Sequence, residues 1–534
     1  MNTRRVPQDL GWLRTLLASP CKVLCLASAV FFLSVVEKFY DPNTGFSSLI
    51  SIGDRVGENK VTQLKGVLHY VYEESSGYDG AYYVQLALNP TLDNPELKTS
   101  IDNLPYRAKR ILFCWAAWVL GLGQPAWIVQ AHALLNVLCW LALGWVLLRW
   151  FPPTNGENFL RWAAVMFSHG VCMSVRHSLV DGPSLLLVAL AMRWVEDGQR
   201  TRGAAVLALA GLGKETSLLA VAGVAEFDWR APRTWRRPAL TAAAVALPLL
   251  AWMGYVRWKF GPADDPGLGN FTFPLAGLAE KWGDALANLG SRGDSPLKWA
   301  TVAVTAALTM QWLFFALRWR PADAWWRIGA AFAGMMVFLS TPVWEGFPGA
   351  STRVLLPMTL AFNVLVPRGR KWLAVLIVGN LTVVASYKEF APPAREFYQL
   401  AGESAVVGAV RVELQGGWSG PENFHGDRWR WSEGDSQLRL RNEAGGPLTL
   451  VVRGNVAALD ARTLRIFAGE ALVWSGEVGE KKASFKFGCV LPESGVGLRF
   501  VSDKPGRKVG SDPRQLSFSI FNLEFVVTPS DGPR

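Results

Sequence analysis

Residues 126–150 read AWIVQAHALLNVLCWLALGWVLLRW, an apolar run whose one charged side chain, Arg149, stands near its end. A helix needs about 20 consecutive apolar residues to cross the hydrocarbon core of a bilayer. Comparable runs recur at 18–37, 159–178, 181–197, 238–257, 298–318, 325–343, 351–367 and 371–387. The apolar stretch 203–227 is interrupted by GLGKET, which predicts two short helices, 203–213 and 214–227. The pattern indicates a polytopic α-helical membrane protein with about eleven crossings.

Composition supports this class and argues against others. The 534 residues are 50% hydrophobic and only 18% charged, against about 25% charged residues in a soluble domain. The net charge is +11, but the basic residues cluster in short loops between apolar runs and form no nucleic-acid motif. Five of the six cysteines lie in or beside apolar runs and Cys489 stands alone, so no disulfide framework is predicted. No CxxC or HExxH spacing occurs, so no metal site is predicted.

The basic loops orient the chain, because positively charged loops stay in the cytoplasm. Such residues precede the first run and follow alternate runs: Arg4, Arg5, Arg14, Arg149, Arg200, Arg202, WRAPRTWRR (229–237), Arg318, Arg320, Arg327 and PRGRK (367–371). A cytoplasmic N-terminus places all of them inside, and it places 38–125, 258–297, 344–350 and everything after 388 outside. The basic-then-apolar start lacks a small-residue cleavage site and predicts a retained first span.

Three segments of the outer loops predict short or amphipathic helices, and the one at 110–123 is expected to lie in or dip into the outer leaflet. They are LKGVLHYVYEE (64–74), RILFCWAAWVLGLG (110–123), which is too short to cross comfortably, and FPLAGLAEKWGDALANLG (273–290).

After Lys388 the pattern changes to short alternating segments separated by turn residues, which predicts an all-β sandwich of jelly-roll-like type. The predicted strands are SQLRLRN, LTLVVRG, TLRIFAG, ALVWSGEV, ASFKFGCV, VGLRFVS and LSFSIFNLEFVV. The expected organisation is a membrane domain over 1–390, a linker over 391–402, an extracytoplasmic sandwich over 403–528 and a disordered tail over 529–534.

Ionisable residues inside or beside membrane spans are costly and usually face a cavity or a partner. Here they converge on the predicted outer face of the membrane: Asp79, Arg107, Lys109, Arg110, Arg176, His177, Asp181, Lys214, Glu215 and Arg353. A cavity with several cations and one carboxylate suits an anionic, lipid-borne substrate whose phosphate pairs with Arg or Lys. Asp79 could accept a proton from a hydroxyl there, and Tyr78, Tyr82 and Tyr83 could supply an aromatic wall.

The blocks GYDGAYYVQLALNP, LPYRAKRIL, SLVDGPSLLL, GLGKETSLL and STRVLLP, in this order, resemble the signature blocks of bacterial GT-C superfamily glycosyltransferases. This superfamily includes mannosyltransferase-like membrane enzymes, and the resemblance covers about residues 15–390. It implies a hexosyltransferase of the inner membrane that transfers a sugar from a polyprenyl-phosphate donor to an envelope glycan or lipid at the outer face.

The resemblance also implies residue roles. Asp79 matches the catalytic base of an inverting displacement, and Arg107, Arg110 and Arg353 would bind the donor phosphate. The sugar and acceptor pocket would contain Tyr78, Tyr82, Tyr83, Arg176, His177, Asp181, Lys214 and Glu215. The paired acids often found in the superfamily are missing, because Gly80 and Ala81 follow Asp79. This favours metal-independent catalysis without a cofactor, although the sequence does not exclude a divalent metal ion.

Structural alternatives stand beside these roles. Asp79 could cap a helix beginning at Gly80, and Asp181 could cap the fourth span. Lys214 and Glu215 could pair with each other at the break, Lys109 could be an interfacial anchor, and His177 could be a structural hydrogen-bonding group. The whole chain could also be a transporter or flippase of a lipid-linked or anionic solute, or a non-catalytic assembly subunit.

In the C-terminal domain, Trp418, Trp429 and Trp431 lie near Glu422 and Asp427. Aromatic and acidic side chains together bind sugars, so these tryptophans are candidate glycan contacts. They are equally typical of a sandwich core, which we expect for at least one of them.

Overall fold

The computed structural model describes residues 19–41, 44–53, 60–72, 75–225, 235–261, 266–290, 296–346, 349–392, 403–407, 409–424, 427–443, 446–510 and 512–528. The predicted tail 529–534, most of the predicted linker 391–402, and Arg4, Arg5 and Arg14 lie outside these residues. The chain divides into two compact units, one over Met1–Phe39, Phe46–Leu64 and Val71–Pro392, the other over Tyr40–Gly45, Lys65–Tyr70 and Pro393–Arg534.

The first unit is helical. Its α-helices are α2 (Pro20–Glu37), α3 (Thr62–Lys65), α4 (Gly80–Leu88), α5 (Leu97–Ser100), α6 (Leu104–Ala108), α7 (Leu112–Leu120), α8 (Pro125–Leu147), α9 (Gly156–Met166), α10 (His169–Arg176), α11 (Asp181–Glu196), α12 (Arg200–Gly213), α13 (Val221–Val224), α14 (Arg236–Phe260), α15 (Ala276–Gly290), α16 (Pro296–Leu317), α17 (Ala324–Phe338), α18 (Thr341–Trp344), α19 (Ser351–Val354), α20 (Leu356–Leu365) and α21 (Arg370–Val378). The 3-10 helices are η2 (Ser47–Ile50), η4 (Glu215–Ala220), η6 (Pro266–Asn270) and η7 (Leu381–Phe390).

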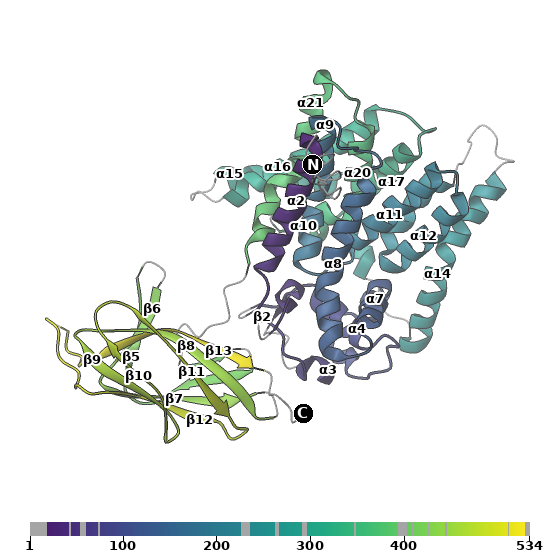
Figure 1. Ribbon diagram of the computed structural model, residues 1–534. Coiled ribbons are helices and arrows are strands. Elements are labelled where there is room, and N and C mark those ends of the chain that lie inside the picture. Colours follow the sequence, from purple (N-terminus) through teal and green to yellow (C-terminus); the bar gives the residue numbers. More distant parts are fainter. Residues whose placement is uncertain are drawn as a thin grey trace, which may run out of the picture. The chain divides into compact units, whose positions relative to one another are not determined.

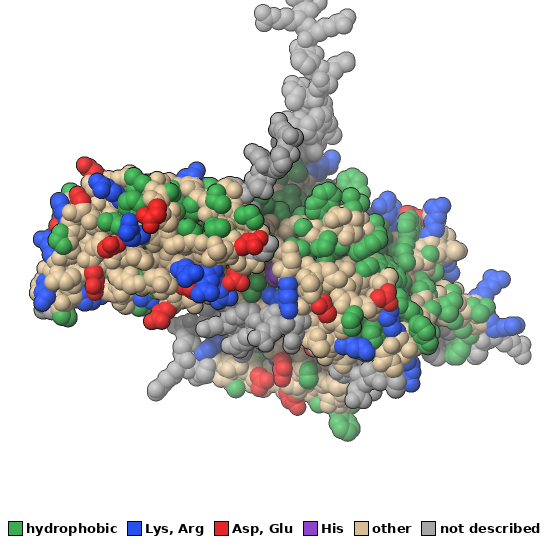
Figure 2. Space-filling model, turned by 90° about the horizontal axis from the view of Figure 1, so that it is seen from below, with side chains coloured by type: hydrophobic (Ala, Val, Ile, Leu, Met, Phe, Trp, Pro, Cys, Tyr) green, Lys and Arg blue, Asp and Glu red, His purple; other side chains and the backbone are tan. Residues whose placement is uncertain are grey.

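The long helices lie side by side. Helices α8, α11, α12 and α14 contact one another in this order across the unit (Figure 1). Apolar side chains gather on the flank where α14 lies (Figure 2), and Leu240, Leu247, Leu250 and Trp258 of this helix are all more than half exposed. Such a surface is suited to lipid rather than to water.

Four of the described helices are long and apolar enough to cross a membrane: Pro20–Glu37, Pro125–Leu147, Arg236–Phe260 and Lys298–Leu317. The pair α21 and η7, bent by 43°, makes up to five if it is counted as one span. The helical unit is therefore that of a multi-pass membrane protein, but the expected count of about eleven crossings is not confirmed.

The count falls short because several predicted spans are broken. The run 159–178 divides at Phe167 and Ser168 into α9 and α10, and 351–367 divides at Leu355 into α19 and α20. Pro357 follows the second break, where its missing N–H fits the start of a helix. Irregular backbone at membrane depth is tolerated where it is buried in protein or lines a cavity.

The outer-loop predictions have mixed outcomes. Helices α7 and α15 confirm the predicted short and amphipathic helices at 110–123 and 273–290. Over its described part, residues 64–72, the predicted helix at 64–74 is wrong, because α3 ends at Lys65 before Gly66. Val71–Tyr72 is a short strand, β2, that pairs in parallel with β1 (Ile52–Gly53), as suits β-branched and aromatic residues.

The second unit is a sandwich of two antiparallel sheets. Its strands are β3 (Ser404–Val407), β4 (Val410–Leu414), β5 (Trp418–Phe424), β6 (Asp427–Ser432), β7 (Asp435–Asn442), β8 (Leu448–Ala458), β9 (Arg462–Ala468), β10 (Ala471–Val478), β11 (Ala483–Leu491), β12 (Val496–Ser502) and β13 (Phe518–Thr528). One sheet has the order β10-β9-β12-β7-β4-β3 and the other β11-β8-β13-β6-β5.

The seven predicted strands coincide with β7 to β13, which confirms the β-sandwich. Side chains of β7 alternate strictly between exposed and buried over six residues from Asp435, as expected for a strand with one face in the core. The shared core contains Leu438, Val452, Phe485, Phe500 and Phe518.

Candidate active site

The candidate site begins at Asp79, the residue before α4. Its backbone accepts the first hydrogen bonds of this helix, but its side chain makes no capping bond. Instead Oδ1 lies 3.0 Å from Arg107 Nη1 and Oδ2 lies 3.2 Å from Arg353 Nη1. The carboxylate thus joins two guanidinium groups, and the capping alternative does not account for it.

Burial alone would raise the pKa of Asp79, since it disfavours the charged form. The guanidinium groups of Arg353 and Arg107 outweigh this effect, so the pKa lies below its ordinary value. Asp79 is therefore ionised at neutral pH, and its side chain remains 19% exposed.

Arg107 on α6 is held in place on both sides. Its Nε and Nη2 donate to the two oxygens of Asp102 at 3.0 and 2.7 Å, a bidentate geometry that fixes the plane of the guanidinium. The rings of Tyr82 and Tyr106 lie 5.0 and 5.5 Å from its Cζ. Arg107 is thereby oriented toward Asp79 before any ligand binds.

Arg353 on α19 reaches three groups from a nearly buried position. Its Nη1 lies 3.5 Å from Asp181 Oδ2 as well as near Asp79, and its Nη2 donates to Tyr78 Oη at 3.3 Å. Asp181 is the first residue of α11 and also pairs with Lys214, which follows α12. Asp181 therefore serves in an ion-pair network and makes no capping bond to the backbone of the helix it begins.

Arg110 belongs to a second cluster. Its Nε and Nη2 donate to Glu215 at 2.8 and 2.6 Å, and Nη1 donates to Tyr83 Oη at 2.8 Å. Lys214 and Glu215 therefore do not pair with each other as the local alternative expected, because each pairs across the fold. Glu215 already balances the charge of Arg110, unlike the shared cations around Asp79.

The three tyrosines differ in exposure. Tyr83 is 1% exposed, and burial raises its pKa to about 12, so its ring cannot serve as a wall for a substrate. Tyr78 stacks on His177 with ring centroids 4.5 Å apart. Tyr82, beneath Arg107, and Tyr78 remain as candidate wall residues.

Arg176 and His177 contact the segment between α2 and α4. Arg176 donates to the backbone oxygen of Ser48 at 3.1 Å and to Tyr72 Oη at 2.7 Å. His177 Nδ1 lies 2.8 Å from Ser51 Oγ, which favours the structural interpretation of this histidine. Lys109 lies over the Tyr106 ring, with Nζ 5.6 Å from the ring centroid.

Sequence reasoning missed Glu389, near the end of η7. Its two oxygens each lie 3.4 Å from a histidine, His169 Nε2 and His177 Nε2. His169 Nδ1 in turn lies 2.8 Å from Oγ1 of Thr352, the neighbour of Arg353. The only sequence signal was an acid at the end of an apolar run, where the composition changes toward the sandwich.

In the sandwich, Trp418 packs against the rings of Phe500 and Phe518 and donates through Nε1 to the Gln437 carbonyl. This places Trp418 against the core, as expected for at least one tryptophan. Trp429 lies beside Phe521, Trp431 is half-buried on β6, and Glu422 pairs with Arg514. The side chain of Asp427 lies outside the described residues.

The described residues contain no group of three or more His, Cys, Asp or Glu side chains that could hold a metal ion. The arrangement can perform proton transfer and anion binding: a partly exposed carboxylate lies between two cations, on a unit that carries membrane-spanning helices.

Comparisons with known proteins add little to this geometry. No protein-family model matches the sequence, and no curated protein sequence matches it. Among solved structures, arabinosyltransferase EmbB from Mycobacterium smegmatis is similar with a TM-score of 0.30 and 13% sequence identity, over 88% of this chain and 64% of that chain. The chain thus spans less than two thirds of that protein.

Proposed function

We propose that this chain is a membrane glycosyltransferase of GT-C type. It transfers a sugar from a polyprenyl-phosphate donor to an envelope glycan or lipid at the outer face of the bacterial inner membrane. The observation that carries the proposal is the placement of Asp79 between Arg107 and Arg353, beside Tyr78 and Tyr82. The resemblance of the sequence blocks around these residues supplies the lipid-linked donor.

The proposed reaction is a single displacement with inversion. A hydroxyl oxygen of the acceptor attacks the anomeric carbon from the face opposite the phosphate, and its proton passes to Asp79. The bond from the anomeric carbon to the phosphate oxygen breaks, and the lipid phosphate leaves with the electron pair. Arg353 and Arg107 stabilise the charge that develops on this phosphate.

The same cations have two partners in this scheme. Without donor they hold the carboxylate of Asp79, and with donor they also face a phosphate. A phosphate that draws the guanidinium groups away from Asp79 leaves the carboxylate a stronger base, because its negative charge is less compensated. Donor binding thereby prepares the proton acceptor.

The test is sugar transfer by the full chain in membranes, with a panel of radiolabelled polyprenyl-phosphate sugars. Asp79→Asn should lose transfer by about 10²- to 10⁴-fold, the range for general acid–base catalysis, while donor binding is retained. The matched control is Asp197→Asn, which changes an exposed pair with Arg149 outside the site. Full transfer by Asp79→Asn, or no transfer from any donor by the unaltered chain, would overturn the proposal.

A further inference from the structure

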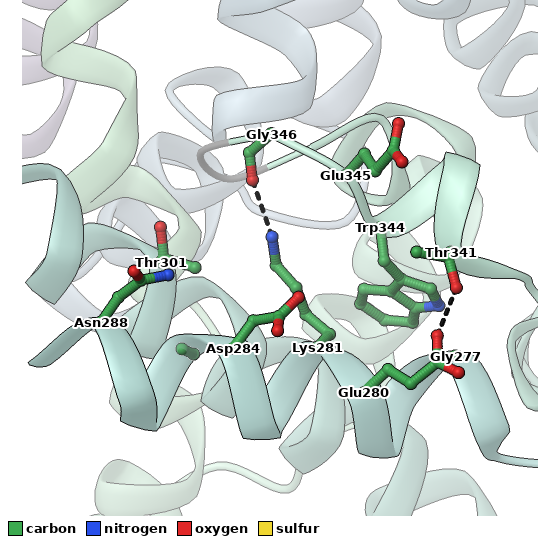
Figure 3. A pocket seen from close by; sticks show the side chains of 11 residues that line it. Gly277, Glu280, Lys281, Asp284, Asn288, Thr301, Thr341, Trp344, Glu345 and Gly346 are labelled. Atoms are coloured by element: carbon green, nitrogen blue, oxygen red, sulfur yellow. Dashed lines mark hydrogen bonds between the residues drawn. The ribbon is translucent and has the colours of Figure 1, made fainter.

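A cavity that does not include Asp79 lies between α15, α16 and α18. Its volume is about 210 Å³. Because a water molecule in the liquid occupies about 30 Å³, this space suits one sugar-sized ring and is smaller than the usual site for a drug-sized molecule. Figure 3 shows that α15 supplies one wall, while Trp344 and the residues after it supply the other.

The walls are fixed by contacts between these two segments. Lys281 Nζ donates to the Gly346 carbonyl at 2.7 Å, and Thr341 Oγ1 bonds to Glu280 (Figure 3). Gly277 allows the close approach, since a Cβ there would lie 2.2 Å from the Leu339 carbonyl oxygen. The cavity is therefore built by the packing of the fold.

The lining is rich in hydrogen-bonding groups packed around a buried tryptophan. Trp344 is 2% exposed and its Nε1 has no hydrogen-bond partner in the described part of the chain. Asp284 and Glu345 are exposed carboxylates at the cavity (Figure 3). A sugar ring offers hydroxyl donors to these carboxylates.

The charges of the lining side chains limit which ligands the cavity can bind. Three carboxylates line the cavity, those of Glu280, Asp284 and Glu345, against one ammonium group, that of Lys281. The surplus of negative charge repels phosphates and uronic acids. Among the described residues these acids are not placed to share a metal ion.

We propose that this cavity binds one neutral or amine-bearing sugar ring. Its use as a subsite for a distal ring of the acceptor rests on the glycosyl transfer proposed above. The link is the segment that carries both sites: Gly346 lines the cavity and Arg353, the partner of Asp79, follows seven positions later. Even fully extended, seven residues span at most about 25 Å, so one oligosaccharide could reach both.

The first experiment measures binding and needs no transfer. The full chain in detergent is studied by saturation-transfer NMR with three probes: the methyl glycosides of a neutral hexose, an amino hexose and a hexuronic acid. The test variant is Asp284→Ala/Glu345→Ala, and the control is Glu470→Ala/Glu480→Ala, which removes the same charge from exposed positions of the sandwich. Thermal unfolding verifies that both fold.

The neutral and amino probes should bind to the unaltered chain and to the control, and the test variant should bind them at least about tenfold more weakly. Equal binding of the hexuronic probe, or unchanged binding by the test variant, would overturn the sugar site.

A second experiment measures transfer. The test variant should raise the acceptor KM about tenfold while kcat and the donor KM stay unchanged, and an unchanged acceptor KM would refute the subsite. If the unaltered chain transfers no sugar, the proposed function fails while the binding result still stands or falls alone.

Discussion

Arg353 Nη1 lies 3.2 Å from Asp79 Oδ2, although the two residues are 274 positions apart in the sequence. The same nitrogen lies 3.5 Å from Asp181 Oδ2, so one guanidinium group joins the starts of α4 and α11 to α19. An anionic ligand that binds Arg353 must compete with two carboxylates. The affinity for a donor phosphate therefore depends on how readily Arg353 is released from Asp79 and Asp181.

We predict that Arg353→Lys lowers kcat by about 10²- to 10³-fold, the range measured for loss of one transition-state donor. Lysine keeps the charge, but a compact ammonium group cannot replace the fork that reaches both carboxylates and Tyr78. The measurement is sugar transfer at saturating donor. The control is Arg149→Lys, at an exposed pair, which should transfer sugar as the unaltered chain does. A near-normal kcat in Arg353→Lys would contradict a role for the forked guanidinium group.

We predict that Arg107→Gln moves the acid limb of the pH profile of kcat/KM to higher pH. Asp79 accepts a proton only when ionised, and its pKa is held below the ordinary value of 3.8 by Arg353 and Arg107 against the effect of burial. Removing one cation raises this pKa, so activity is lost at a higher pH. Lys109→Gln removes the same charge at the end of the same helix and should leave the acid limb unmoved.

The depressed pKa of Asp79 also affects the stability of the fold. Because the folded pKa of Asp79 is depressed, its ion pairs contribute fully above the unfolded pKa and the contribution is lost as pH falls through the folded pKa. Between neutral pH and about pH 4, Arg107→Gln should therefore be less stable than the unaltered chain, with the difference shrinking in stronger acid. Thermal unfolding in detergent across this range measures it, and a constant difference would contradict the assignment.

The sequence predicted best what depends on local pattern. Alternation in SQLRLRN and VGLRFVS identified β7 and β12 because one face of each strand enters the core. Hydropathy found α2, α8, α14 and α16, whose apolar runs have no central break. It failed at 64–74, where an apolar spacing suited to a helix conceals Gly66 and the strand-forming Val71 and Tyr72.

The site was only partly accessible from the sequence. The sequence predicted that Asp79, Arg107 and Arg353 lie close together, because each stands in a short polar segment that interrupts apolar sequence. Which acid pairs with which base could not be predicted: Lys214 and Glu215 are adjacent, yet Lys214 pairs with Asp181 at the start of α11 and Glu215 pairs with Arg110 between α6 and α7. Such pairs are set by tertiary packing, and sequence spacing carries no signal for them.

We predict that the pair Arg110–Glu215 stabilises the fold rather than the reaction. Arg110 is nearly buried and the side chain of Glu215 is 30% exposed. Breaking a fully buried pair from one side costs about 3–5 kcal/mol, and the cost is smaller for this partly exposed pair. Arg110→Met and Glu215→Met should still each lower the unfolding temperature, because each leaves an uncompensated charge. The double variant should recover much of the loss, because no charge is left alone. A double-mutant cycle by thermal unfolding in detergent tests this, and strictly additive losses would show that the two side chains act independently.

We predict that Glu389→Gln lowers kcat about tenfold to a hundredfold while the donor KM changes little. Glu389 lies 3.4 Å from both His169 and His177. His169 contacts Thr352, which precedes Arg353, and the ring of His177 stacks on Tyr78. Glutamine has nearly the same shape but lacks the charge that attracts both imidazoles, so the groups around Asp79 lose alignment, and small misplacements of reacting groups are costly. Steady-state kinetics of transfer separate kcat from KM, with Glu403→Gln, an exposed acid at the start of the sandwich unit, as the matched substitution. If Glu389→Gln lowers only the unfolding temperature and leaves kcat unchanged, Glu389 stabilises the helical unit without positioning the site.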